Sequence, residues 1–178
     1  QILNHRYIQK LPTVLTTNCK IQDLDGRIAS RLEDPSLVTR IVIQAPDYRK
    51  PFAGISDPGN LSSLHQLTGR TFESFDSRMQ EGLSEEAAAQ LGNAFNQAYA
   101  FAQKPAGWLV FSGPNGIGKT HLAAAIGNYR QLKMDQPVFI VAANLLDHLR
   151  ASFSPTSTVT YDSVFEKIRN APLLIFSK

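Results

Sequence analysis

The chain has 178 residues, of which 43% are hydrophobic and 19% are charged, and its formal net charge is +3. These values are typical of one folded globular domain and exclude a disordered or fibrous chain. The sequence contains no apolar run near the roughly 18 residues that a membrane helix needs. A single cysteine excludes an internal disulfide, and we expect a cytoplasmic protein.

The first fifty residues contain two short apolar segments, 11–18 and 39–46, that we expect to be strands. The segment 24–32 between them contains Arg27 and Arg31 four residues apart, a spacing that places both on one face of a helix. These fifty residues hold eight lysines and arginines against five acidic residues. The surplus favours an acidic partner such as DNA about as well as it favours a solvated basic face. The residues expected to contact DNA are Arg27, Arg31, Arg40, Arg49 and Lys50.

The next part of the chain combines a predicted linker with a predicted helix. Residues 49–70 are rich in proline, glycine and serine, which is typical of a linker. Ser84 and the two glutamates after it predict the start of a helix, because acidic side chains stabilise a helix N-terminus. The predicted buried stripe of this helix is Leu91, Phe95, Ala98 and Ala102.

The sequence GPNGIGKT, residues 113–120, matches the phosphate-loop pattern G-x-x-x-x-G-K-[S/T] in full. An apolar segment, 107–112, precedes it, and a good helix former, 120–130, follows it. Such a loop curls its backbone N–H groups around phosphates at the positive end of the helix. We therefore predict that Lys119 binds the β- and γ-phosphates of ATP and that Thr120 supplies a hydroxyl to Mg²⁺. The predicted nucleotide-binding residues are Gly113, Pro114, Asn115, Gly116, Ile117, Gly118, Lys119, Thr120 and His121, and we expect His121 to pack or cap the helix instead of catalysing.

The rest of the chain continues the alternation of strands and helices. Strands are predicted at 137–142 and 173–176, and helices at 144–153 and 159–171, the second with Val164 and Ile168 on one face. Short apolar strands that alternate with helices indicate a parallel sheet covered on both faces. The sequence therefore predicts an α/β fold of the P-loop NTPase type, in three layers around a five-stranded parallel sheet.

Residues 108–130 together with 141–175 resemble the ATPase module of the bacterial DnaC/IstB group of AAA+ proteins. Members of this group load the replicative helicase or assist a transposase. The resemblance implies that 11–18 is the sensor-1 strand, with Asn18 on the γ-phosphate or the attacking water. It also implies that 24–32 is the arginine-finger helix and that Arg31 is the finger that reaches the nucleotide of a neighbouring copy. The implied partners are ATP, a helicase or transposase, single-stranded DNA and other copies of this chain.

The halves of the module stand in the opposite order from that of the family. Residues 1–50 resemble the sensor-1 and arginine-finger half, 51–82 are a linker with an adenine-side segment at 71–76, and 83–178 are the phosphate-loop half. Three explanations remain open: a permuted ATPase, parts of two modules in tandem, or a numbering that departs from the natural chain order. The family order of strands predicts neighbours in the sheet in the order of the strands that contain Ile41, Val110, Val14, Leu174 and Phe139.

The resemblance implies two aspartates directly after Ile175 that hold the metal ion, whereas this chain continues with Phe176, Ser177 and Lys178. Two hypotheses follow. The chain is an ATPase that loads a helicase, or it is a nucleotide-responsive binding module or transposase helper with little hydrolysis of its own. Robust hydrolysis would require another acid, with Asp147 and Asp162 the first candidates.

Overall fold

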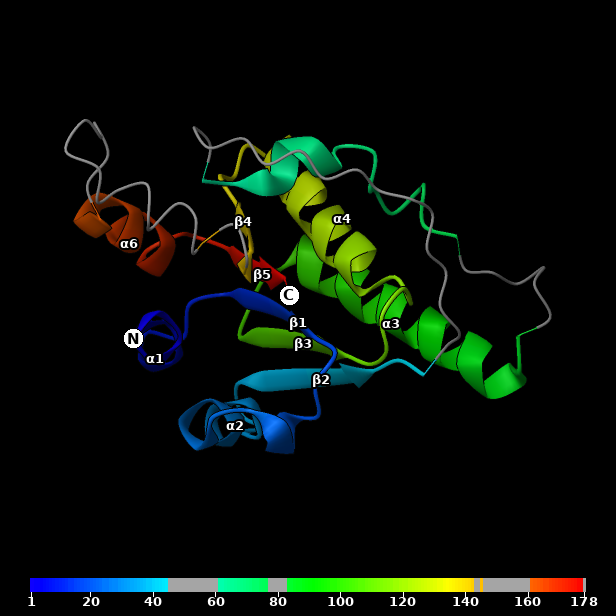
Figure 1. The fold of residues 1–178 in the computed structure, drawn as a ribbon. Helices are drawn as coiled ribbons and strands as arrows, with labels where there is room; N and C mark the ends of the chain where they lie inside the picture. The colour runs from blue at the N-terminus through cyan, green and yellow to red at the C-terminus, as the bar shows by residue number, and fades with distance from the viewer. Residues whose placement is uncertain (45–60, 77–82, 143–144, 146–160, 178) are drawn as a thin grey trace.

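The computed structural model describes residues 1–44, 61–76, 83–142, 145 and 161–177. Five parallel strands form one sheet with helices on both faces, which confirms the predicted α/β fold (Figure 1). The strands are β1 (Thr13–Thr17), β2 (Val38–Val42), β3 (Trp108–Ser112), β4 (Val138–Val141) and β5 (Leu174–Ser177).

The strand order is β2-β3-β1-β5-β4, as the family order of strands predicts. β1 lies between β3 and β5, with Thr13 opposite both Trp108 and Leu174. Two strands from the first fifty residues therefore flank β3, the strand that leads into the predicted phosphate loop.

Helices cover both faces of the sheet and complete three layers (Figure 1). α3 (Glu85–Gln103) and α4 (Lys119–Leu132) pack on one face, and α1 (Ile2–Ile8), α2 (Gly26–Leu32) and α6 (Tyr161–Arg169) pack on the other. Two 3-10 helices, η1 (Ile21–Asp23) and η2 (Ser63–Leu67), complete the described elements. Among the described residues, none of the helices is both long and apolar enough to cross a membrane.

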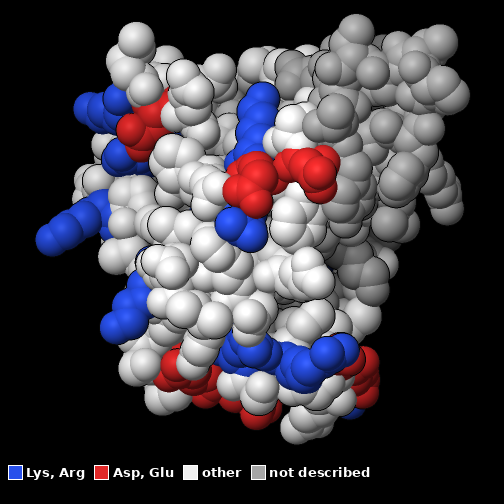
Figure 2. Space-filling model, turned by 90° about the vertical axis from the view of Figure 1, so that its left-hand side faces the viewer, with Lys and Arg blue, Asp and Glu red and all other residues white. Residues whose placement is uncertain are grey.

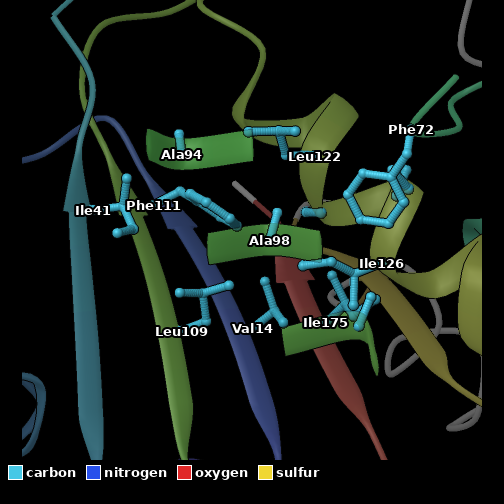
Figure 3. Packing of buried hydrophobic residues seen from close by; sticks show 14 of the residues in the cluster. Val14, Ile41, Phe72, Ala94, Ala98, Leu109, Phe111, Leu122, Ile126 and Ile175 are labelled. Carbon is cyan, nitrogen blue, oxygen red and sulfur yellow. The ribbon is translucent and has the colours of Figure 1, made fainter. Parts of the chain in front are cut away.

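The larger core lies between the sheet and the helices α3 and α4 (Figure 3). Ala94 and Ala98 are fully buried, and their small side chains let α3 lie close to the strands. The prediction of a buried stripe on α3 is not met at Phe95, which is only partly buried. Its ring instead packs edge to face on Phe72, at 5.5 Å between ring centroids.

The opposite face of the sheet carries two smaller clusters. Trp108 and Val110 pack towards α2, and Ile140 and Leu174 pack towards α6. The residues of β3 that alternate with Trp108 and Val110 pack in the larger core instead, because successive side chains of a strand point to opposite faces of the sheet. Val164 and Ile168 of α6 are buried, as predicted.

Arg6 of α1 is fully buried beneath these elements, and burial lowers its pKa to about 10. Its guanidinium joins three parts of the chain, the starts of β1 and β5 and the end of α6. Its partners are Thr13 Oγ1 (3.0 Å) and the carbonyl oxygens of Pro12 (2.6 Å), Ala171 (2.8 Å), Arg169 (3.1 Å) and Ile168 (3.3 Å).

The predicted linker includes a segment that packs tightly. In 61–76, Leu64 and Leu67 are buried, and the Ser62 hydroxyl accepts a hydrogen bond from the Phe139 N–H at 3.1 Å. This contact covers the β4 edge of the sheet. The remaining residues of the predicted linker, 49–60, and nearly all of the predicted helix 144–153 lie outside the described residues, and the domain boundaries stay predictions.

Candidate nucleotide-binding site

The loop 113–118 connects the end of β3 to the start of α4. Gly113, Gly116 and Gly118 have φ angles of 143°, 77° and 98°, a region that side-chain-bearing residues rarely adopt. A Cβ on Gly113 would lie 2.0 Å from the Ile43 carbonyl oxygen, so glycine is required there. The glycines therefore produce the sharp turn that leads the backbone from β3 into the first turn of α4.

Lys119, the first residue of α4, lies across this loop and is only 8% exposed. Its ammonium donates to the carbonyl oxygens of Gly113 at 2.9 Å and of Pro114 at 2.6 Å. The positive charge is thus held inside the curl of the backbone. An anion bound by the N–H groups of the loop would meet this ammonium directly.

A chain of three hydroxyls joins the loop helix to the neighbouring strands. Thr120 Oγ1 lies 3.2 Å from Ser177 Oγ at the end of β5, which lies 3.1 Å from Thr16 Oγ1 of β1. Mg²⁺ prefers oxygen ligands and usually keeps several waters, so the Thr120 hydroxyl fits one position of its shell. β5 supplies a serine here and contains no acid, and no group of three metal-binding side chains occurs among the described residues.

Asn18 follows β1 directly and reaches the loop, where its side-chain amide donates to Asn115 Oδ1 at 3.2 Å. The structure therefore brings together Asn18 and the loop, although they are 97 residues apart in the sequence. The carboxyl ends of parallel strands meet at one edge of a sheet, which explains this proximity.

Arg31 lies elsewhere, on α2 at the opposite face of the sheet. Its guanidinium donates to Asn4 Oδ1 and to the Arg27 carbonyl oxygen, and it lies 5.6 Å from the centroid of the Tyr7 ring. It also lines a cavity of about 710 Å³ whose apolar wall includes Phe176. Within one chain, Arg31 and the loop are therefore separate, and its role as a finger stays a prediction.

His121 points towards the segment 70–76. Its Nε2 lies 2.9 Å from the Thr71 carbonyl oxygen, and its Nδ1 lies 3.4 Å from a guanidinium nitrogen of Arg70. Burial lowers the pKa of His121 below its ordinary value, and the charge of Arg70 lowers it further, while the bond to Thr71 opposes both. The contacts of His121 with this segment agree with the expected packing role, and direct contact with nucleotide stays a prediction.

Two further residues of this region escaped the sequence analysis. The side-chain amide of Asn128 donates to the carbonyl oxygens of Leu67 at 2.8 Å and of Arg70 at 2.9 Å. Ser177 was assigned no role beyond its inability to hold a metal ion. A polar residue on the apolar side of a helix, and a hydroxyl at the end of a buried strand, are the signals that point to Asn128 and Ser177.

The expected DNA-binding surface is mixed in charge. Basic and acidic side chains lie side by side on the face that carries α1, α2 and α6 (Figure 2). Arg27, for example, pairs with Asp25 at 3.4 Å. Arg49 and Lys50, also expected to contribute, lie outside the described residues.

Comparison with known proteins identifies the family. Residues 56–169 match the family described as IstB-like ATP binding protein. The replicative helicase loader DnaC of Buchnera aphidicola subsp. Schizaphis graminum is 31% identical over 93 residues, 52% of this chain and 35% of that protein. The DnaC of the subspecies Acyrthosiphon pisum is 35% identical over 69 residues, 39% of this chain and 28% of that protein.

The chain thus spans about a third of the length of these relatives. No solved structure matches it. The family match covers well over half of the chain and includes β3, the loop and α4. The chain therefore belongs to the IstB-like ATP-binding proteins, in agreement with the DnaC/IstB resemblance of its sequence.

Proposed function

We propose that this chain binds ATP together with Mg²⁺ at the loop 113–120 and acts as a module of the helicase-loader type. The main support for this proposal is the position of the Lys119 ammonium. It is enclosed by the loop at the N-terminus of α4, beside glycines with positive φ. In this proposal the loop N–H groups and Lys119 bind the phosphates, and Thr120 holds the metal ion. Asn18 would contact the γ-phosphate from the neighbouring strand.

Mg²⁺, when bound, would neutralise charge on the β- and γ-phosphates. Hydrolysis further requires a group that fixes the metal and orients water, and Ser177 offers only a hydroxyl beside Thr120. This observation favours the second candidate function, a nucleotide-responsive binding module or transposase helper with little hydrolysis of its own.

The proposed partners follow from the relatives, which are named replicative helicase loaders. We propose that this chain contacts a replicative helicase, and that single-stranded DNA and other copies of the chain are further partners. A transposase is the alternative partner protein.

The test of nucleotide binding is the variant Lys119→Ala. Loss of the ammonium should weaken binding of a fluorescent ATP analogue about 100-fold, because charged hydrogen bonds to phosphate are lost. Lys133→Ala is the matched control, since Lys133 is an exposed residue that follows the other end of α4. Equal affinities of Lys119→Ala and Lys133→Ala would refute the proposed site.

The test of assembly uses Arg31→Ala. If Arg31 acts on the nucleotide of a neighbouring copy, this variant should keep monomeric ATP affinity and lose ATP-dependent self-association or turnover. Mixing Arg31→Ala with Lys119→Ala should restore part of the turnover, because some interfaces then contain one intact site. Failure of the mixture to exceed either variant alone would argue against action between subunits.

A further inference from the structure

The segment 70–76 is attached to α4 one residue after the predicted phosphate ligands. His121 provides the attachment through its bond to the Thr71 carbonyl oxygen at 2.9 Å, with Ser74 Oγ also 3.3 Å from Nε2. Asn128 provides a second attachment through the Leu67 and Arg70 carbonyl oxygens. His121 and Asn128 are seven residues apart and so lie on one face of α4.

The contacts of His121 determine which of its ring nitrogens carries the proton. The Thr71 carbonyl oxygen can only accept, so Nε2 carries hydrogen and donates. The Arg70 guanidinium can only donate, so Nδ1 is the acceptor. Both nitrogens are thus engaged by the segment, and the imidazole has no further ring donor to offer to a phosphate.

The same segment supports the loop through Phe75. The Phe75 ring packs edge to face on the His121 ring, with 5.2 Å between centroids. Phe75 Cε2 would lie only 3.0 Å from a Cβ on Gly118, so the ring occupies the space directly beside this glycine. Gly118 has a φ of 98° and immediately precedes Lys119.

We infer that His121 is a positioning residue for nucleotide binding, which holds the segment 70–76 so that Phe75 supports the loop at Gly118. The inference rests on the proposed nucleotide site and assigns to His121 an action through Phe75 instead of contact with ATP. Binding at the loop and the position of the segment 70–76 are then coupled. The coupling runs through contiguous side chains, from Gly118 to Phe75 and from Phe75 to His121.

The experiment compares His121→Ala with His121→Gln. The glutamine side-chain N–H can replace the bond that Nε2 donates to the Thr71 carbonyl oxygen. His121→Ala should weaken binding of the fluorescent ATP analogue about 3- to 10-fold, the size expected for one neutral hydrogen bond. His121→Gln should restore affinity to within about twofold of the parent chain. His65→Ala is the control, because His65 lies in η2, outside the segment 70–76, and bonds to the Ser62 carbonyl oxygen at 2.9 Å.

A second readout separates positioning from general loosening of the fold. ATP should slow amide hydrogen exchange in both 113–120 and 70–76 of the parent chain, but only in 113–120 of His121→Ala. Phe75→Leu should lower affinity to a similar extent, and adding His121→Ala to it should cause little further loss, because both act on one path. This second variant keeps the test decisive if His121→Ala folds poorly.

Parent-like affinity and parent-like exchange in His121→Ala would overturn the inference, as would additive losses in the double variant. These outcomes differ from failure of the proposed site itself. Parent-like binding by Lys119→Ala would refute the nucleotide site. If instead Lys119→Ala loses binding and His121→Ala binds like the parent chain, the nucleotide site stands and only the role of His121 is refuted.

Discussion

β1 and β5 are neighbours that are held by polar side chains at both ends, and the two ends differ in kind. Near their amino ends, the charged and fully buried Arg6 binds five oxygens. At their carboxyl ends, the neutral hydroxyls of Thr16 and Ser177 bind each other, and Ser177 also binds Thr120.

The amino ends of β1 and β5 thus have a structural role, and their carboxyl ends lie at the proposed functional site. Two of the oxygens bound by Arg6 are terminal carbonyls of α6, where the helix dipole favours a cation. This closed network would leave several buried acceptors unpaired if the arginine were removed. Hydroxyls, in contrast, exchange partners at little cost, which suits an edge where a ligand and a metal ion are expected to bind.

The largest expected effect is that of Arg6→Met. The variant keeps much of the apolar stem but loses five hydrogen bonds, and it should lower the free energy of unfolding by about 3–5 kcal/mol. Urea unfolding followed by circular dichroism measures the change. Arg27→Met is the control, because the Arg27 side chain is 88% exposed and its change should stay within about 0.5 kcal/mol. A loss below about 1 kcal/mol for Arg6→Met would show that the network contributes little.

A smaller effect is expected at the other end, where Ser177→Asp introduces a carboxylate beside Thr120. The acid should help to hold Mg²⁺ and orient water, and raise ATP turnover about 100-fold at saturating ATP and Mg²⁺. Ser177→Asn has a similar shape without the charge and should turn over ATP as slowly as the parent chain. Equal rates for the two variants would show that a carboxylate at position 177 does not serve the metal ion. Fast turnover by the parent chain would show that another acid does.

The smallest effect concerns a hydrogen bond near the amino ends of the strands, from the Tyr7 hydroxyl to Asp34 Oδ2 at 2.5 Å. The Ser36 hydroxyl and then the Tyr7 hydroxyl lower the pKa of Asp34. The same bond, donated to Asp34, raises the pKa of Tyr7 above its ordinary value. Asp34 therefore contributes stability above the pKa of its unfolded carboxyl and loses it as pH falls through the lowered folded value. The Tyr7 phenol contributes stability below the pKa that it has in the unfolded chain, and this stability is lost as pH rises through its raised pKa in the folded chain.

Tyr7→Phe should raise the pKa of Asp34 part of the way to its usual value, since the bond from Ser36 remains. An NMR titration of the side-chain carboxyl carbons measures this shift. The Asp25 carboxyl is the internal control, because the backbone N–H of Arg27 is the main cause of its lowered pKa. An unchanged pKa for Asp34 would show that the bond to Tyr7 does not persist in solution.

The carboxyl edge of the sheet was largely predictable from the sequence. Apolar runs located all five strands, and the glycines with Lys119 and Thr120 located the loop, because these signals lie within a few consecutive residues. The family resemblance then gave the strand order that the structure confirms. It also implied that Asn18 acts on the γ-phosphate or the attacking water. The bond to Asn115 brings Asn18 to the loop, and its contact with phosphate stays a prediction.

The sequence by itself determined the five strands, most of the helices and the loop where phosphates are expected to bind, because local periodicity and turn chemistry carry that information. These local patterns did not predict α1 or η2. Only the tertiary structure decided the partners of Arg6, the contact between Ser177 and Thr120, and the direction of His121. The contact of Ser177, the bond of His121 to a carbonyl oxygen and three of the five partners of Arg6 involve groups 50 or more residues away in the sequence. A buried polar side chain binds whichever oxygen the packing of the elements brings within reach, and no spacing along the chain specifies that oxygen.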